Sequence, residues 1–311
     1  MTENIRTKTS FVCLIAGICS FLWGSAFPFI KIGYSLFEIP SDDTGTQILF
    51  AGIRFTIAGI LAVIIGSISN RKLLIPEKRD IAPVCILSLF QTILQYFFFY
   101  IGMANTSGVK GSVIIGANVF IVMLIAVFVF RTEKLTLKAV IGCITGFAGI
   151  ILINLNGLTE GTMKLTGEGF VLLSTVAYAF SSCIMKNYSK KHNTVLLSAY
   201  QFIFGGIVMI IGGLIMNGKI TVVTPKGIAV LIYLSFISAV AYSLWSMLLK
   251  YNDVSKVSVF GFMNPMFGFI FSAILLNEKS EVGGFRGIIA ICLVCLGIFI
   301  VNKNKTVAKK T

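Results

Sequence analysis

The sequence predicts an all-α integral membrane protein with ten transmembrane helices arranged as two inverted five-helix repeats. Three observations predict it: an apolar composition, hydrophobic runs of membrane-spanning length, and an ordered series of matches between the two halves. Of the 311 residues, 56% are hydrophobic and 12% are charged, and the mean hydropathy is +0.93. Soluble domains usually carry about a quarter charged residues, so this composition argues against a water-soluble enzyme. The abundance of Leu, Ile, Val and Phe excludes intrinsic disorder.

Hydrophobic runs occur along the whole chain and are separated by short polar loops, which leave no room for a separate soluble domain. A membrane-crossing helix needs about 20 mostly apolar residues. The first run is too long for a signal-peptide core and has no small-residue cleavage site, so we expect it to be retained. The expected spans are Phe11–Phe37, Gln47–Ile68, Ile81–Met103, Val109–Phe130, Leu137–Leu155, Gly169–Asn187, Thr194–Met216, Gly227–Leu249, Val257–Leu276 and Gly287–Val301.

The basic residues are distributed unevenly between the two sides of the membrane. The formal net charge of +14 comes from 26 Lys and Arg against 12 Asp and Glu. If the amino terminus is cytoplasmic, 18 of the basic residues fall in cytoplasmic segments and 6 in outer segments. This bias follows the positive-inside rule and predicts a multi-pass plasma-membrane protein with both termini in the cytoplasm. It also accounts for most of the basic excess, so no nucleic-acid partner is expected.

The two halves of the chain share an ordered series of residues, which indicates an internal duplication. The expected repeats are residues 1–158 and 159–311, with five spans each. Because five is odd, the second copy enters the membrane from the opposite side, and a substrate site is expected near the midplane between the copies. The matches, at offsets of 145–155 residues, are Lys31 with Lys186, Tyr96 with Tyr242, Lys110-Gly111-Ser112 with Lys256-Val257-Ser258, Asn118 with Asn264, and Glu133 with Glu278.

Several motifs resemble the EamA-type family of the drug/metabolite transporter superfamily. They are Trp23-Gly24-Ser25-Ala26-Phe27-Pro28-Phe29-Ile30-Lys31, Arg54-Phe55, Glu133 followed by Gly142 and Gly149, and Asn264-Pro265 followed by Leu276-Asn277-Glu278. The resemblance implies two inverted helical bundles that move metabolites, amino acids or drugs across the plasma membrane. Val119 stands where the second copy has Pro265, which argues against a proline kink in the fourth span.

The distribution of charged residues argues against several alternative functions. None of the acidic residues lies deep in an expected span, and His192, the only histidine, lies in a loop. Proton-driven carriers generally titrate an embedded acid or histidine, so a carboxylate-relay antiporter is not expected. The chain has neither the embedded Asp pair nor the H-E-x-x-H zinc motif that a membrane-embedded enzyme would need. It also has no nucleotide-binding loop. Cys292 and Cys295 are interpreted as small apolar residues, and neither a metal nor a cofactor is expected.

Polar residues at helical spacing give the candidate binding site. Ser88, Gln91, Thr92 and Gln95 share one face of the third span, and Ser235, Ser238, Tyr242 and Trp245 share one face of the eighth. A glutamine facing lipid would cost about 1–3 kcal/mol in unmet hydrogen bonds, so both faces should point inward, either to line a cavity or to join helices. The candidate substrate-binding residues are Gln91, Gln95, Tyr96, Tyr242, Trp245, Asn118, Asn264, Trp23, Tyr178 and Arg54.

Other residues have structural interpretations. Arg54 either reaches toward the interface or a helix-end carbonyl, or contacts an anionic substrate group. Pro28 and Pro265 lie inside helices and are expected to kink them. Glu133 and Glu278 are expected to stabilise the starts of the fifth and tenth helices, and Gly142 and Gly146 form a face for close helix packing.

We therefore expect a secondary transporter of small organic solutes, amino acids or related metabolites, that works by alternating access, in the direction of export. Its expected partners are a small-molecule substrate and the lipid bilayer, and the sequence leaves the oligomeric state open. The alternatives are a multidrug efflux carrier of the same fold, a membrane-embedded enzyme, and a non-transporting scaffold or sensor.

Overall fold

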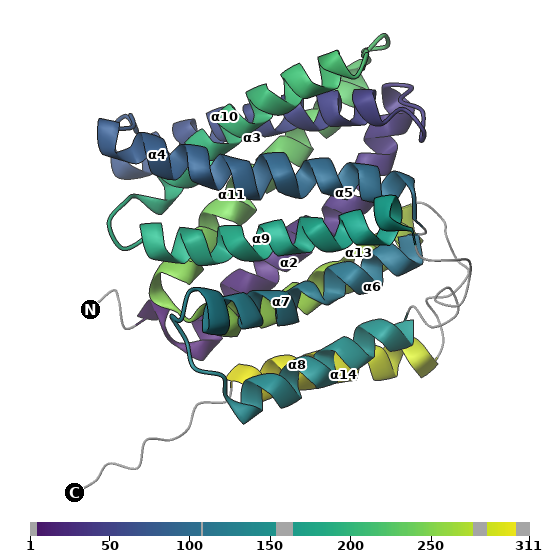
Figure 1. Ribbon diagram of the computed structural model, residues 1–311. Helices are drawn as coiled ribbons and strands as arrows, with labels where there is room; N and C mark the ends of the chain where they lie inside the picture. The colour runs from purple at the N-terminus through teal and green to yellow at the C-terminus, as the bar shows by residue number, and fades with distance from the viewer. Residues whose placement is uncertain (1–4, 107, 154–163, 276–284, 303–311) are drawn as a thin grey trace, which may run out of the picture.

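Ten helical passes lie side by side along one direction (Figure 1), in a computed structural model that describes residues 5–106, 108–153, 164–275 and 285–302. The predicted all-helical membrane fold is confirmed. The passes are α2 (Thr9–Leu36), α3 (Thr44–Asn70), α4–η1–α5 (Lys78–Leu87, Ser88–Leu94, Gln95–Ala104), α6–α7–η2 (Gly108–Gly116, Asn118–Leu124, Ile125–Val129), α8 (Leu137–Ile153), η4–α9 (Leu165–Gly169, Phe170–Tyr188), α10 (Thr194–Ile215), α11 (Pro225–Tyr251), α12–η5–α13 (Val254–Ser258, Val259–Phe262, Met263–Leu275) and α14 (Phe285–Asn302).

The passes have the length and surface of membrane helices. Six of the described helical segments are long and apolar enough to cross a bilayer on composition alone, and three further apolar helices are shorter. Large apolar side chains are exposed on the outer faces, as at Ile68 (73%) and Ile215 (77%). In a bilayer these side chains contact lipid, while the helices satisfy their own backbone hydrogen bonds.

Local sequence signals set several helix starts. The Asp43 carboxylate accepts hydrogen bonds from the backbone N–H and the hydroxyl of Thr46 at the start of α3. The Asn193 side chain caps α10, and the Thr224 hydroxyl caps α11, which begins with Pro225. Such caps satisfy N–H groups that have no partner inside the helix.

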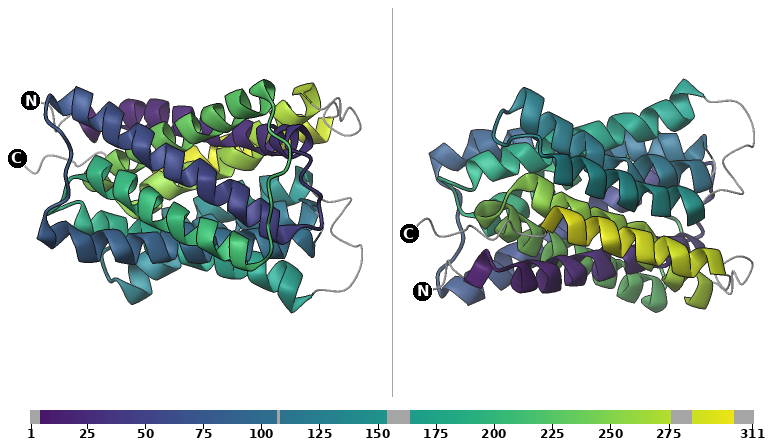
Figure 2. Two further views of the ribbon diagram at one scale, coloured as in Figure 1. Left: turned by 90° about the horizontal axis from the view of Figure 1, so that it is seen from above. Right: turned by 90° about the horizontal axis from the view of Figure 1, so that it is seen from below.

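The two halves exchange equivalent contacts. The first pass, α2, packs against α11 and α13, which belong to the eighth and ninth passes. The sixth pass, α9, packs in the same way against η1 and α5 of the third pass and α6 and α7 of the fourth. The second and seventh passes (α3 and α10) pair with each other, as do the fifth and tenth (α8 and α14), and Figure 2 shows both pairs from above and below.

This exchange has the symmetry of an inverted repeat. Each half contributes five passes, so the sixth pass crosses in the direction opposite to the first. The start of α2 and the end of α14 consequently lie at the same end of the molecule, which we call the terminal end (Figure 1). The predicted pair of inverted five-helix repeats is confirmed.

Glycines allow the equivalent passes to pair closely. A Cβ on Gly52 of α3 would lie 2.6 Å from the backbone N of Ile210 in α10. In α8, a Cβ on Gly142 would lie 2.8 Å from the carbonyl O of Gly297, and one on Gly146 would meet the ring of Phe262 at 2.6 Å. The predicted close packing at Gly142 and Gly146 is confirmed.

The positions of the two prolines predict only part of where the helices are interrupted. The helix α2 runs unbroken through Pro28. In the ninth pass, the 3₁₀ segment η5 precedes Pro265. The fourth pass is interrupted at Ala117, where Phe120 N–H bonds the Ala117 carbonyl O at 3.0 Å, although no proline follows. The interruptions of the fourth and ninth passes therefore lie at matching places in the two copies. The interruption of the fourth pass forms without a proline.

Glu133 has a different structural role from the predicted one. Its carboxylate accepts hydrogen bonds from the backbone N–H groups of Val254 and Ser255, the latter at 3.2 Å. It thus stabilises the start of the ninth pass, in the other half of the chain, rather than the start of the fifth. Glu278 lies outside the described residues.

Candidate functional site

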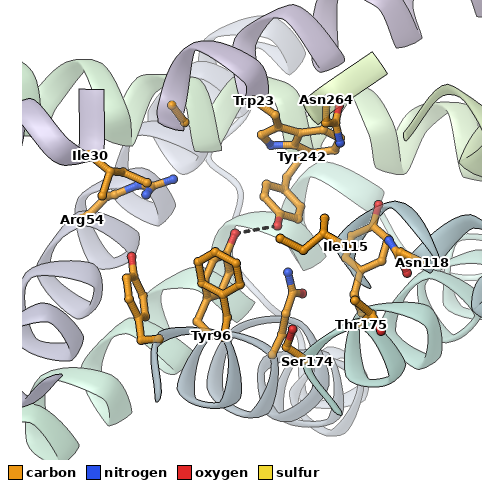
Figure 3. A pocket seen from close by; sticks show the side chains of 15 residues that line it. Trp23, Ile30, Arg54, Tyr96, Ile115, Asn118, Ser174, Thr175, Tyr242 and Asn264 are labelled. Atoms are coloured by element: carbon orange, nitrogen blue, oxygen red, sulfur yellow. Dashed lines mark hydrogen bonds between the residues drawn. The ribbon is translucent and has the colours of Figure 1, made fainter. Parts of the chain in front are cut away.

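A cavity of about 160 Å³ lies between the two halves of the bundle (Figure 3). Eight of the ten candidate binding residues line it: Trp23, Arg54, Gln95, Tyr96, Asn118, Tyr178, Tyr242 and Asn264. Gln91 and Trp245 are not part of its wall. The role of the eight residues in substrate binding stays a prediction, but their convergence on one cavity is a property of the fold.

Two matched tyrosines form the centre of the wall. The hydroxyl oxygens of Tyr96 in α5 and Tyr242 in α11 lie 2.9 Å apart, and Figure 3 draws this hydrogen bond. The Tyr96 ring lies 4.4 Å from that of Phe55, and the Tyr242 ring packs edge-on against Phe202 at 4.9 Å. Because both rings are wedged against phenylalanines, the hydroxyl pair is held rigidly between the two halves.

Trp23 forms another part of the wall and separates Trp245 from the cavity. Its ring packs edge-on against Tyr242 and against Trp245, each at 5.1 Å between ring centroids. Trp245 is 3% exposed and is not among the residues that line the cavity, and its role in substrate binding stays a prediction. The helical spacing correctly placed it on the face of Tyr242, but Trp23 from another helix covers that part of the face.

Arg54 brings a positive charge to the cavity. Its side chain is 3% exposed and donates from Nη2 to the Ser238 hydroxyl at 3.0 Å, so it does not reach the interface. The Ser235 hydroxyl donates a hydrogen bond to the backbone carbonyl O of Arg54 at 3.0 Å. The Nε and Nη1 atoms of Arg54 are buried and have no hydrogen-bond partner among the described residues.

Three amide side chains offer hydrogen-bond acceptors in the cavity wall. The side-chain oxygens of Gln95, Asn118 and Asn264 are buried without a hydrogen-bond partner in the described part of the chain. Asn118 and Asn264 are equivalent in the two copies and lie next to the interruptions of the fourth and ninth passes. Leaving a buried polar atom unpaired costs about 1–3 kcal/mol, and these oxygens are free to accept hydrogen bonds within the described part of the chain.

Gln91 lies outside the cavity wall, in the π-helical part of the third pass. The third pass is π-helical over η1 (Ser88–Leu94), where each residue turns less far around the axis than in an α-helix. Ser88 donates to the backbone carbonyl O of Gln201 at 2.9 Å, and Thr92 to the Gln201 side-chain oxygen at 2.6 Å. The predicted polar stripe is therefore divided, with Ser88 and Thr92 joined to α10 and Gln95 at the cavity.

The cavity wall includes residues that the sequence analysis missed: Ala26, Ile30, Phe99, Tyr100, Ile115, Ser174 and Thr175. Three of them had a usable signal, because Tyr100 lies one helical turn after Tyr96, and Ser174 and Thr175 lie one turn before Tyr178. The Ser174 and Thr175 hydroxyls donate to carbonyl oxygens of their own helix at 2.7 Å, which leaves their lone pairs to accept. The apolar members carried no such signal.

The cavity lies toward one end of the bundle. Ile30 lies in the last part of α2 and Tyr100 in the last part of α5, while Ile115 lies in α6 at the start of the fourth pass. All three positions are nearer the end opposite the terminal end. Toward the terminal end, the cavity is bounded by Trp23 and Tyr242.

Known proteins share this architecture. The EamA-like transporter family matches residues 10–155 and 165–303. An uncharacterized transporter of Archaeoglobus fulgidus is 27% identical, with 91% of this chain and 96% of the relative covered. The uncharacterized transporter YvbV of Bacillus subtilis is also 27% identical, over 100% of this chain and 96% of its own. The uncharacterized inner membrane transporter YedA of Escherichia coli K12 is 23% identical, with 92% and 91% covered.

The fold also matches a solved structure. A crystal structure with 15% sequence identity superposes with a TM-score of 0.75 and covers 94% of this chain and 96% of its own. The family match extends over both halves of the chain, in agreement with the repeated packing of the passes. This protein is therefore a multi-pass membrane transporter, with a small-molecule substrate, that belongs to the EamA-like transporter family of the drug/metabolite transporter superfamily.

Proposed function

We propose that this transporter is a secondary carrier of small zwitterionic or carboxylate-bearing metabolites, with amino acids as the leading substrate class. Transport is by alternating access and in the direction of export. The positive-inside bias of the sequence supports a plasma-membrane location with both termini in the cytoplasm.

The observation that carries the proposal is the environment of Arg54. The buried Nε and Nη1 atoms of Arg54 have no hydrogen-bond partner among the described residues. No Asp or Glu of the described part of the chain lines the cavity. An unpaired buried charge costs several kcal/mol. A substrate carboxylate would supply the missing charge and hydrogen bonds, and charge-assisted bonds of this kind are about twice as strong as neutral ones.

The opposite side of the cavity suits an ammonium group. The unpartnered oxygens of Gln95, Asn118 and Asn264 can accept from a cation, and the faces of Trp23 and Tyr178 can contribute cation–π attraction. This combination favours a solute that carries both charges. A simple organic cation would leave Arg54 unpaired and add repulsion.

The size of the cavity favours small metabolites over drugs. Pockets that hold drug-sized ligands have volumes of about 300–1,000 Å³, whereas this cavity measures about 160 Å³. A multidrug efflux carrier of the same fold is therefore the weaker candidate.

The repeat architecture supports alternating access. At the terminal end, Glu133 of the first half bonds Val254 and Ser255 of the second, and the Arg6 Nη1 donates to the Tyr251 hydroxyl at 2.7 Å. Since the cavity lies toward the other end, these contacts lie on the closed side. Exchange of the two repeat conformations would release them and open the cavity to the terminal end.

Ligand binding to the purified protein tests the substrate class. The melting temperature is measured with amino acids, with the matching amino-acid amides, which lack the carboxylate, and with the matching amines. We expect stabilisation by amino acids alone, since a ligand that binds only the folded state raises the melting temperature. Equal stabilisation by the amides would contradict the role of Arg54, and stabilisation by amines alone would contradict the substrate class.

A further inference from the structure

A second cavity, of about 660 Å³, lies at the terminal end of the bundle. Its wall is formed by the last turns of α3 and α11, the connection from α9 to α10, and Arg6. The helices α3, α10 and α11 form one face of the molecule in Figure 1, away from α6, α7, α8 and α14. The helices α3 and α11 line both cavities, but the two cavities share no lining residue, and the second lies nearer the terminal end.

The polar part of this cavity is strongly basic. Arg6, Lys190, Lys191 and Lys250 line it, and among the residues that the structure describes no Asp or Glu does. Lys190, Lys191 and Lys250 have exposed side chains, and none of the three forms an ion pair within the described part of the chain. Four positive charges thus face one space without a carboxylate in its wall.

The loop that carries two of these lysines is held in place. His192, the next residue, contacts Asp80 of α4 with 2.6 Å between Nδ1 and Oδ1, and both side chains are nearly buried. Asn193 caps α10 directly afterwards. Lys190 and Lys191 are therefore presented by a fixed turn rather than by a free loop.

The rest of the cavity wall is apolar and faces the surroundings of the helices. Ile65 of α3 is 42% exposed, and Val240, Leu244 and Met247 of α11 are half-buried along the same wall. A soluble anion would use the basic part alone. An amphipathic anion would use the basic part for its head group and the apolar wall for its chain.

The connection that is equivalent to the α9–α10 connection in the first copy is not basic. The connection from α2 to α3, which precedes α3 as the α9–α10 connection precedes α10, contains Glu38, Asp42 and Asp43 and no basic residue. The repeat therefore does not impose a basic cavity on the equivalent connection.

We propose that this cavity binds an anionic phospholipid from the adjacent leaflet. The phosphate lies among Arg6, Lys190, Lys191 and Lys250, and one acyl chain follows Ile65, Val240 and Leu244. Basic pockets between transmembrane helices recognise anionic head groups in this way, and each Lys or Arg near an anionic surface contributes about a fivefold change in affinity.

The test measures phospholipid binding to the purified transporter by native mass spectrometry and by thermal shift. The ligands are phosphatidylglycerol, phosphatidylcholine with the same chains, and inorganic phosphate. The variant K190Q/K191Q is compared with K134Q/K138Q, which removes two exposed lysines at the same end of the molecule but away from the cavity. The melting temperature without lipid verifies the fold of both variants.

We expect phosphatidylglycerol to bind the wild type and the K134Q/K138Q control more tightly than phosphatidylcholine does. The affinity of the K190Q/K191Q variant for phosphatidylglycerol should fall about 25-fold, which is about fivefold for each lysine removed. Equal phosphatidylglycerol affinity in all three proteins would overturn the proposal. Stabilisation by inorganic phosphate as strong as that by phosphatidylglycerol would also overturn it, in favour of a soluble anion.

Discussion

The hydroxyl groups of Tyr96 and Tyr242, which occupy equivalent positions in the two copies, lie 2.9 Å apart and form a hydrogen bond across the centre of the bundle. The pair joins the third pass of the first half to the eighth pass, its equivalent in the second half. It also lines the cavity that contains Arg54. The repeat therefore brings the same residue type from both copies to the place where a solute would bind.

Removing the aromatic side chain of Tyr242 should impair transport without preventing folding into the membrane. Tyr242→Ala deletes a cavity wall together with its contacts to Trp23 and Phe202. Tyr242→Phe removes only the hydroxyl and should cost about 1 kcal/mol of stability. We expect substrate flux in the order wild type, Tyr242→Phe, Tyr242→Ala at equal expression. Wild-type flux in Tyr242→Ala would remove this residue from the site.

Two glutamines in the same pass provide a matched pair. Gln95 lines the cavity, whereas Gln91 is 5% exposed and lies outside its wall. Gln95→Ala should weaken substrate binding about 5- to 150-fold, the equivalent of about 1–3 kcal/mol for one lost hydrogen bond to a charged group. Gln91→Ala should leave the binding constant nearly unchanged. Titration of each purified variant with the same amino acid measures this difference, and equal losses would contradict the assignment of Gln95 rather than Gln91 to the site.

Adjacent glycines in α10 test the packing of the second and seventh passes. A Cβ on Gly213 would lie 2.6 Å from the backbone N of Leu49, whereas one on Gly212 would meet nothing within 4 Å. Gly213→Ala should destabilise the protein by about 1–3 kcal/mol because the helices must separate. Gly212→Ala should be neutral or stabilising by up to about 1 kcal/mol, since alanine favours the helix. Melting temperatures in detergent compare the two, and a lower value for Gly212→Ala would contradict the packing described.

The contact of Glu133 with the start of the ninth pass should favour closure of the terminal end. Glu133→Gln keeps the shape of the side chain but removes its charge from the N–H groups of Val254 and Ser255. We expect faster alkylation of Cys19, which is 0% exposed and donates to the Ala241 carbonyl O, in a variant whose other cysteines are serine. The matched control is Glu77→Gln, since Glu77 is exposed and pairs with the neighbouring Arg79. Unchanged alkylation in Glu133→Gln would show that this contact does not hold the closed state.

The arrangement of passes and repeats could be predicted from the sequence because it depends on patterns that the bilayer imposes. Apolar runs of sufficient length must be helices in a membrane, and an odd number of passes per copy requires inversion. The matches of Tyr96 with Tyr242 and of Asn118 with Asn264 also indicated which residues meet at the centre.

The remaining features depend on geometry that residue spacing does not encode. The spacing rule placed Gln91 on the face of Gln95, but Gln91 lies about one helical turn nearer the terminal end, beyond the cavity wall. Trp245 packs against Trp23, a side chain from another helix, and spacing within one helix cannot predict that contact. The partner of Glu133 lies 121 residues away, in a contact that only the packed halves create.

The most direct test of the proposed transport function is counterflow of a radiolabelled amino acid in proteoliposomes, with wild type, Arg54→Gln and Arg54→Lys. We expect saturable counterflow in the wild type that the unlabelled amino acid blocks and its amide does not. Flux should be lost in Arg54→Gln and partly kept in Arg54→Lys, which retains the charge without the guanidinium geometry. Wild-type counterflow in Arg54→Gln, or equal inhibition by the amide, would contradict the assignment of Arg54 as the carboxylate-binding residue of the carrier.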